Sequence, residues 1–350
     1  MAKRKKGKRM STKKKVLLLL LVVLAIGGFW FYKNNNGELS EKLNIKPNKI
    51  HIKKLKIVDP DSKTRNIAVM INNHKSARMN HAGLQDAYLT YEIIVEGGLT
   101  RMMAIFKDKD TAKIGSVRSS RHYFLDYAME NDAIYTHFGW SPLAQSDISK
   151  YGINNINGLT DSSAFWRDRS LNVASEHTAF TSIEKIKSVA KSKGYRMTSD
   201  SKLLLNYSVK EVSLSEKEGA MVANKVVIPY STYITTSYTY DSDNKVYNRF
   251  VNGEVHKDAI TGKQYTAKNI IIAKMNNSSI DSYGRQDIDN VGTGEGYYIT
   301  DGSAVPIKWS KSSRESKTKY TYNDGTEIKV NDGNTYIQIQ PLSQTTSITE

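Results

Sequence analysis

The sequence predicts an α+β protein with an N-terminal membrane anchor, a mixed α/β domain and a mostly β C-terminal domain. Three observations support this fold class. One uninterrupted apolar run occupies 16–32, and between 61 and 208 runs rich in β-branched residues alternate with helical patterns. From 209 to 343, short strand patterns follow one another, separated by Asn, Asp and Gly. A chain of 350 residues is long enough for two ordinary domains.

The apolar run from Val16 to Tyr32 is predicted to be a single membrane span of near-minimal length. Aromatic residues at its end suit the outer interface, and the basic tail 1–15 suits the cytoplasmic side. A cleaved signal peptide is the alternative, but Phe-Trp-Phe-Tyr-Lys lacks the small residues of a cleavage site. We therefore predict a single-pass cell-membrane protein with a cytoplasmic N-terminus and extracellular C-terminal domains. Segment 33–60, with its lysines and prolines, is predicted to be a linker.

The composition narrows the possible partners. Net charge is +16, and nine of the 51 basic residues lie in the first fifteen positions, which contain no acid. The rest of the chain carries 42 basic and 35 acidic residues, which suits either solubility or an anionic partner. The absence of cysteine excludes disulfides, thiolate zinc sites, cysteine nucleophiles and a lipid-modified cysteine. No DNA- or RNA-binding motif is visible, so nucleic acid is not an expected partner.

The mixed α/β domain, 61–208, is predicted to begin with three strands. Asn66–Ile71 is a buried strand, and Tyr88–Val95 and Leu99–Phe106 form a hairpin. Glu96-Gly97-Gly98 joins the two hairpin strands, because glycines supply the positive φ that a tight turn needs. This turn places Glu96 and Arg101 near one end of the hairpin.

A helix is predicted from Ser119 to Glu130, with Ser119 or Ser120 as its cap. Arg118 and Arg121 are three residues apart and can both lean over its first turn, where free N–H groups favour an anion. Further predicted elements are strands at 133–138 and 153–156 and a helix opened by the Thr181/Glu184 capping box and ended by Gly194.

The stretch from Arg65 to Arg121 contains the motifs A-V-M-I-N-N-H, G-L-Q-D-A-Y-L-T-Y-E, V-E-G-G-L-T-R and I-G-S-V-R-S-S-R. With these motifs the stretch resembles the YerB family of predicted bacterial lipoproteins, whose function is unknown. Further on, R-D-R, E-H-T-A-F-T-S, Y-N-R-F, H-K-D, G-T-G-E-G and G-N-T-Y-I-Q-I extend the resemblance over most of the chain after Pro60. Ser116 and Glu176 stand where the family usually has proline, and no lipobox cysteine is present. The resemblance implies two joined extracytoplasmic domains and assigns no reaction.

The mostly β domain, 209–343, is predicted from eight short strand patterns and their Asn-Gly and Asp-Gly turns. The Gly-rich word at 292–296 lacks the lysine of a phosphate loop and is predicted to be a loop between strands. The last residues, 344–350, are predicted to be a frayed tail. The expected strands are 226–230, 233–240, 246–251, 270–274, 296–300, 319–322, 327–330 and 335–340.

Polar residues at the predicted element ends form the candidate binding site. The candidates are His74, Glu92, Glu96, Arg101, Arg118, Ser119, Arg121, His137 and His177. His and Glu can together form a metal or acid–base site, but no short-spaced ligand motif is present, so we predict no metal and no cofactor. In the second domain, Arg249, His256 and Asp258 are predicted to form a cross-strand polar cluster or, alternatively, a recruiting surface.

These residues predict a membrane-anchored, extracytoplasmic cell-envelope protein of unknown activity. We expect Arg101, Arg118 and Arg121 to converge with Glu96 and His177 on one cavity that binds an anionic wall polymer or a protein partner. Alternatively, Arg101 only pairs with a glutamate and holds the hairpin against the helix. Whether the protein is an enzyme stays open: the second hypothesis is a hydrolase or transferase acting on cell-wall material, with Glu96 or His177 as the acid–base group.

Overall fold

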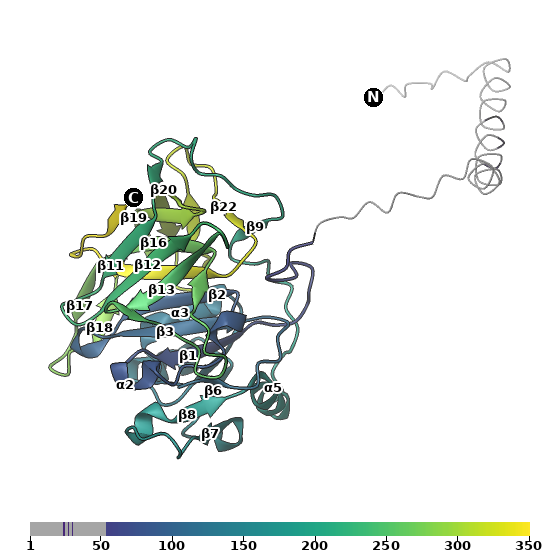
Figure 1. Cartoon of the computed structure of the whole chain (residues 1–350). Coiled ribbons are helices and arrows are strands. Elements are labelled where there is room, and N and C mark those ends of the chain that lie inside the picture. The colour runs from purple at the N-terminus through teal and green to yellow at the C-terminus, as the bar shows by residue number, and fades with distance from the viewer. Residues whose placement is uncertain (1–23, 25–26, 28–29, 31–53) are drawn as a thin grey trace, which may run out of the picture. The chain divides into compact units, whose positions relative to one another are not determined.

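The computed structural model describes residues 24, 27, 30 and 54–350, and all its named helices and strands lie in the compact unit 54–350 (Figure 1). Most of the predicted N-terminal part therefore lies outside the described residues: the cytoplasmic tail, the linker up to residue 53, and the anchor at 16–32 except for positions 24, 27 and 30. Among the residues that are described, no helix has the length and apolar character needed to cross a membrane.

A mixed sheet of eleven strands forms the centre of unit 54–350. Ten of its strands lie in one row and β21 (Lys319–Thr321) pairs with β20 off that row. The row runs β10 (Met221–Val222), β20 (Ser303–Lys311), β19 (Gly292–Thr300), β16 (Asn269–Met275), β23 (Thr335–Pro341), β2 (Leu89–Ile94), β3 (Thr100–Phe106), β1 (Ile67–Asn72), β5 (Ile134–His137) and β6 (Asn155–Asn157).

The predicted hairpin is confirmed as β2 and β3, which pair antiparallel with Ile93 opposite Arg101. Gly97 and Gly98 both have positive φ, 67° and 69°, as the turn requires. The turn itself is a short 3-10 segment, η2 (Glu96–Gly98). It leaves Glu96 and Arg101 at the same end of the sheet.

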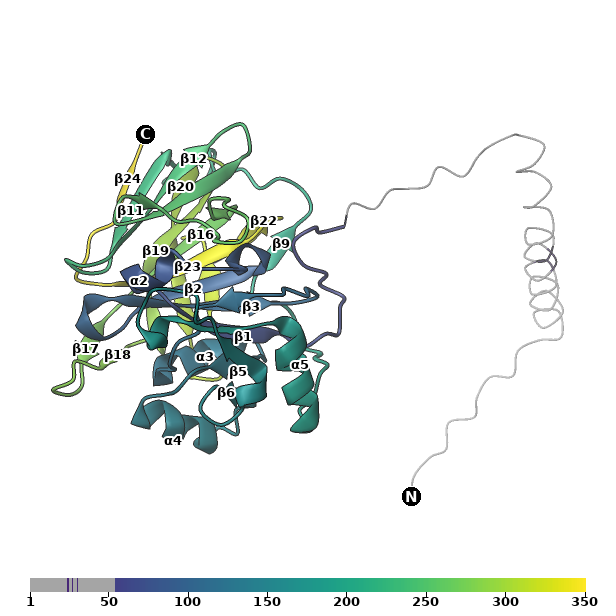
Figure 2. The ribbon, with the colours of Figure 1, turned by 60° about the horizontal axis from the view of Figure 1, so that its bottom comes forward.

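Two helices cover one face of the large sheet: α3 (His122–Glu130) and α4 (Pro142–Lys150) (Figure 2). The Tyr91 ring of β2 lies 4.8 Å from the Tyr127 ring of α3, measured between centroids. The Tyr123 hydroxyl donates to the Ile94 carbonyl at 2.7 Å. Because the side chains of a strand alternate, Tyr91 points to the helices while its neighbour Glu92 points to the opposite face.

A second sheet covers that opposite face. The Tyr230 hydroxyl donates to the Glu92 carbonyl at 3.1 Å, and the Tyr238 and Tyr336 rings meet edge to face at 6.1 Å. Five strands form its row and β15 (Thr266–Ala267) pairs with β13 beside it. The row runs β14 (Glu254–Val255), β13 (Val246–Val251), β12 (Thr235–Asp241), β11 (Lys225–Pro229) and β24 (Ser347–Thr349).

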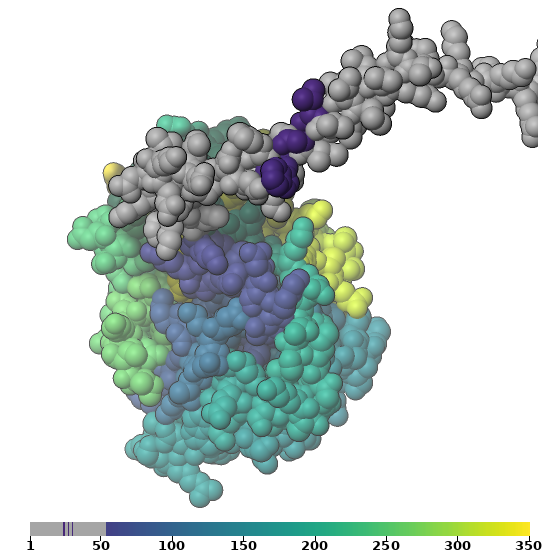
Figure 3. Space-filling view, turned by 90° about the vertical axis from the view of Figure 1, so that its right-hand side faces the viewer, coloured from purple at the N-terminus to yellow at the C-terminus, as the bar shows by residue number. Residues whose placement is uncertain are grey.

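The structure differs from the predicted division into domains 61–208 and 209–343. Strand β23, near the C-terminal end, lies between β16 and β2 and is parallel to both. Strands from both predicted domains thus share one sheet, and residues 54–350 form one compact unit. Figure 3 shows the same mixing at the surface, where blue residues from the first part of the chain adjoin green and yellow residues from its last part.

The remaining elements are small and surround these layers. Short helices and 3-10 turns are α2 (Lys75–Arg78), α5 (Ile183–Ser192), η1 (Leu84–Asp86), η3 (Ser162–Ala164) and η4 (Ser175–His177). The minor sheets are formed by β17 (Asn277–Ser279) with β18 (Gln286–Ile288), β9 (Asn206–Ser208) with β22 (Lys329–Asn331), and β4 (Ile114–Gly115), β8 (Ala179–Thr181) and β7 (Phe165–Arg167).

The predicted helix caps were misplaced by one to two residues. Helix α3 starts after Arg121, whose side chain makes no capping hydrogen bond, so neither Ser119 nor Ser120 caps it. Helix α5 is capped by Ser182, whose side chain accepts from the Lys185 N–H, in place of the predicted Thr181. Propensity alone does not decide which of two adjacent hydroxyl residues points its oxygen at the helix end.

Two segments predicted to be irregular are strands. The Gly-rich word at 292–296 is the first half of β19, which pairs with β20, because glycines without side chains let Ile272 of β16 and Trp309 of β20 come close to this strand. In the predicted tail 344–350, β24 pairs with β11, and Ile348 stands opposite Val226. The tail is therefore part of the six-stranded sheet.

Candidate functional site

A cleft with a volume of about 450 Å³ opens where β1 ends and β3 begins. We call it the arginine cleft. Its walls come from the end of β1, η2, the segment before α3, η4 and the tip of the β17–β18 hairpin. Its lining residues are Asn72, His74, Val95, Glu96, Leu99, Thr100, Arg101, Arg118, Arg121, Glu176, His177, Tyr283 and Arg285.

Glu96 holds two of the arginines in place. Arg121 donates to both of its carboxylate oxygens, the Nη2–Oε2 distance being 2.9 Å, and the Arg101 Nη2 lies 3.7 Å from Oε2. Arg101 also donates to the Ser119 carbonyl at 2.7 Å. Burial alone would raise the pKa of Glu96, but the hydrogen bond and charge of Arg121 outweigh it and lower the pKa.

Arg118 is the least constrained of the three sequence-predicted arginines. Its side chain is 28% exposed, compared with 9% for Arg101 and 13% for Arg121. Its contact is a 3.3 Å hydrogen bond to Glu176, whose side chain is 52% exposed. Burial and the nearby Arg121 cation lower the pKa of Arg101 to about 9, so Arg101 stays a cation at neutral pH.

Four arginines face two glutamates along this lining, so the cleft is positively charged. Guanidinium groups bind carboxylates and phosphates through paired, charge-assisted hydrogen bonds. Because Glu96 already occupies Arg101 and Arg121, Arg118 is the group with most freedom to contact an added anion.

His74 and His177 stack at one side of the arginine cleft, with ring centroids 4.7 Å apart and planes inclined by 7°. The Asn72 Oδ1 accepts from the His74 backbone N–H, so its amide nitrogen faces the His177 Nδ1 at 2.8 Å. Neutral His177 therefore carries its proton on Nε2. Burial, and next the neighbouring His74, lower the pKa of His177.

The β17–β18 hairpin contributes an aromatic rim. Tyr283 is 77% exposed, and the Arg285 guanidinium lies 4.8 Å from the centroid of its ring. Asp281 fixes both residues, because its carboxylate accepts from the Tyr283 backbone N–H at 3.0 Å and from the Arg285 Nη1 at 2.7 Å. The sequence prediction missed this rim, since the hairpin lies far along the chain from the residues it approaches.

The structure brings together six of the nine candidate residues: His74, Glu96, Arg101, Arg118, Arg121 and His177. The other three do not line the arginine cleft. Glu92 is fully buried against Arg249 on the opposite face of the sheet, and Ser119 contributes only its carbonyl, to Arg101. His137 is buried with its Nδ1 2.8 Å from the Gly139 carbonyl, and burial lowers its pKa to about 4.

The predicted second cluster is only partly present. The Arg249 Nε donates to the His256 Nδ1 at 3.1 Å, and the His256 Nε2 lies 2.8 Å from the His81 Nδ1. Asp258 turns away and accepts from the Gly83 N–H and the Tyr265 hydroxyl. Between residues 54 and 350 the structure shows no group of three His, Asp or Glu residues arranged to hold a metal ion.

Comparison with known proteins gives two family models and one relative with a solved structure. Residues 55–196 match the N-terminal domain, and residues 226–337 the C-terminal domain, of "Protein of unknown function (DUF3048)". The chain is 32% identical over 302 residues to "Putative lipoprotein YerB" of Bacillus subtilis (strain 168). This match covers 85% of the present chain and 87% of the relative. The crystal structure of YerB from Bacillus subtilis matches with a TM-score of 0.72 at 31% identity, over 83% of this chain and 95% of that chain.

Proposed function

We propose that this chain, a member of the family of YerB-like DUF3048 proteins, binds an anionic cell-envelope ligand outside the cell membrane. The sequence motifs predicted this family membership. The Bacillus subtilis relative is named "Putative lipoprotein YerB". The present sequence has no cysteine to carry a lipid, so the apolar run 16–32 is proposed to take over membrane attachment. The basic tail before it then stays in the cytoplasm, and unit 54–350 faces outward.

The observation that carries the binding proposal is the arrangement of cations in the arginine cleft. Glu96 pairs with both Arg101 and Arg121. The Arg118 side chain makes one 3.3 Å hydrogen bond, to the exposed Glu176. A preorganised cluster of this kind recognises phosphate or carboxylate groups. An anionic wall polymer offers many such groups, and multiple weak contacts add up along a polymer.

Replacing Arg118 by glutamine is expected to weaken anion binding by roughly tenfold or more, because a charge-assisted hydrogen bond contributes about 1.5–3 kcal/mol. The probes are inorganic phosphate and a purified phosphate-rich wall polymer, titrated into the full-length chain by calorimetry. The loss should shrink as salt is added. Lys63→Gln is the matched control, since it removes a charge at an exposed site that does not line the arginine cleft. Equal affinities of Arg118→Gln and the parent chain would contradict the proposal.

Anion binding is also expected to strengthen as the pH falls. His177 is neutral at pH 7 because its pKa is lowered from 6.5, and its protonation below that value adds a positive charge to the cleft. A bound anion stabilises the protonated ring, so affinity rises as the pH falls through the pKa that His177 has in the complex and levels off below its pKa in the free chain. Inorganic sulfate is the suitable probe, because its own charge stays constant from about pH 5 to 8. His177→Gln should flatten most of this profile, and an equally steep profile would rule out His177.

The second hypothesis, a hydrolase or transferase acting on cell-wall material, rests on the same residues. The lowered pKa of Glu96 keeps its carboxylate ionised, which makes it a poor general acid. His177 is left as the acid–base candidate. Release of soluble products from purified wall material by the full-length chain, abolished in His177→Gln, would favour an enzyme over a binding protein.

A further inference from the structure

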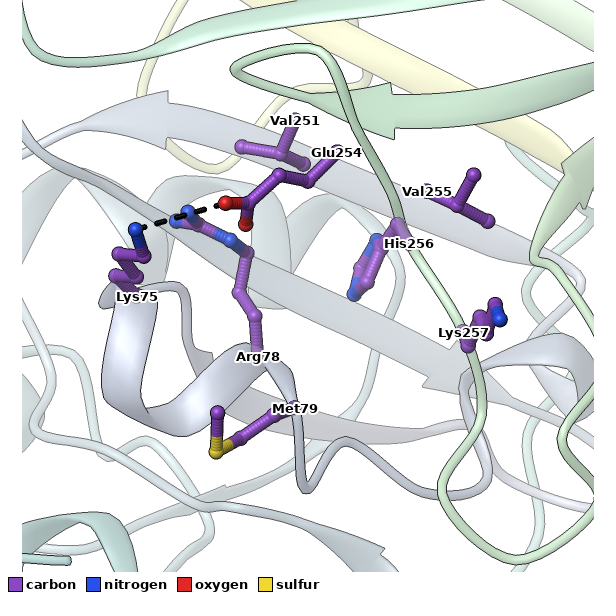
Figure 4. Close-up of a pocket in the computed structure, with 8 residues that line it drawn as sticks. All are labelled: Lys75, Arg78, Met79, Val251, Glu254, Val255, His256 and Lys257. Atoms are coloured by element: carbon purple, nitrogen blue, oxygen red, sulfur yellow. Dashed lines mark ion pairs between the residues drawn. The ribbon is translucent and has the colours of Figure 1, made fainter.

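A second cavity, of about 500 Å³, lies between α2 and β14, and we call it the Arg78 cavity (Figure 4). Its volume is within the range of small-molecule sites. Helix α2 separates it from the arginine cleft, because His74 at the start of this helix lines the cleft while residues farther along line the cavity.

The Arg78 side chain extends from α2 into this cavity and is nearly buried, with a residue exposure of 7% (Figure 4). A guanidinium group has five N–H donors. One hydrogen bond is formed, from Nη1 to the Asn73 carbonyl at 2.9 Å, and within residues 54–350 Arg78 makes no salt bridge. A desolvated cation without a paired anion is costly, and burial accordingly lowers the pKa of Arg78.

The other charges of the cavity leave an excess of positive charge near Arg78. Lys75 and Lys257 line the cavity, and Glu254 is its one acidic lining residue. Glu254 pairs with Lys75 at 3.5 Å (Figure 4), and its side chain is 61% exposed. An exposed carboxylate beside a buried guanidinium is in the position of a competitor for an incoming anion.

The rest of the wall is aliphatic or neutral. Met79 and Val255 also line the cavity and are 69% and 43% exposed, so they add apolar surface to its wall. The His256 Nδ1 accepts from Arg249 and its Nε2 bonds to His81. Burial and the charge of Arg249 lower the pKa of His256 far below its ordinary value, so this ring stays neutral.

We propose that the Arg78 cavity binds the terminal carboxylate of a short peptide whose last side chain is small and aliphatic. The planar guanidinium fork of Arg78 matches a carboxylate, and the wall formed by Met79 and Val255 accepts the aliphatic side chain. Strand β14 is the outermost strand of its sheet, so its free edge can pair with the peptide backbone. This inference does not depend on the arginine cleft.

The test compares two peptides that differ only at the end: N-acetyl-alanyl-valine and its C-terminal amide. Calorimetric titration of the full-length chain should show the carboxylate binding roughly tenfold or more tightly than the amide, which is the difference that one strong ionic contact makes. Arg78→Met should remove this preference. Glu254→Gln should tighten carboxylate binding several-fold, because it removes the competing carboxylate. Lys63→Gln, which removes a charge at an exposed site outside both cavities, should leave this preference unchanged.

Two outcomes would overturn the proposal. One is equal binding of acid and amide by the parent chain. The other is a preference for inorganic phosphate over the peptide that is lost in Arg78→Met, since it would assign a different ligand class. If Arg78→Met does not fold, the test uses two variants at exposed positions, Glu254→Gln and Met79→Ser. Unchanged peptide affinity in both variants would also refute the proposal.

Discussion

Replacing Arg249 by methionine is expected to destabilise unit 54–350 by about 3–5 kcal/mol, which is the usual effect of removing one partner of a buried ion pair. The Arg249 and Glu92 side chains are both fully buried, and their Nη2–Oε2 distance is 3.0 Å. Arg249 comes from β13 of the six-stranded sheet and Glu92 from β2 of the large sheet, so the pair joins the two layers. Burial opposes the charge of Arg249, but Glu92 outweighs it and raises the pKa of Arg249 above its ordinary value.

The reason for the large effect is that Glu92 would stay buried and lose its counterion. Its carboxylate would retain only neutral donors: Asn73 at 3.0 Å, Thr100 at 2.8 Å and Thr236 at 3.1 Å. Denaturant unfolding of the full-length chain measures the loss. The double variant Glu92→Gln with Arg249→Met should recover part of it, because the amide oxygen still accepts hydrogen bonds and no charge remains. A loss below about 1 kcal/mol in the single variant would show that the pair does not hold the layers together.

Local patterns were enough to predict most strands of this fold. The alternation of Val246–Val251 predicts a strand with the bounds of β13, and two glycines with positive φ mark the turn of the β2–β3 hairpin. Strand β20 escaped prediction because Pro306 lies inside it, and proline is uncommon in strands. The insertion of β23 between β2 and β16 depends on pairing between distant segments, which no local pattern encodes.

The candidate site shows the same limit. Glu96, Arg118 and Arg121 could be predicted because all three flank short turns of adjacent elements. Glu92 was misassigned, because its place in a strand does not tell which of the two faces is covered by another layer. Tyr283 and Arg285 were missed because their hairpin approaches the cleft only through the tertiary fold. Charged residues at element ends therefore indicate a site, while the identity of its far wall requires coordinates.

Lys311 and Glu130 form a second fully buried ion pair, on the helix-covered side of the large sheet, at an Nζ–Oε2 distance of 2.8 Å. Lys311 ends β20 and Glu130 ends α3, so the pair fixes the helix to a strand from the last part of the chain. Glu130 also accepts from the Tyr91 hydroxyl at 2.6 Å and from the backbone N–H and hydroxyl of Thr318 at 2.9 and 2.7 Å. All its contacts therefore hold α3 in place.

Lys311→Met is expected to cost about 3–5 kcal/mol of unfolding free energy, because Glu130 then stays buried without its counterion. Adding Glu130→Gln should cost less than the sum of the two single changes, with a coupling energy of about 1–3 kcal/mol, since the second change removes the charge that the first left unpaired. Denaturant unfolding of the two single variants and the double variant measures this cycle. The exposed pair of Lys63 and Asp200 supplies the control, and Lys63→Met should cause no measurable loss. Strictly additive effects at Lys311 and Glu130 would show that helix α3 is held by packing against Tyr91 and its neighbours and not by the ion pair.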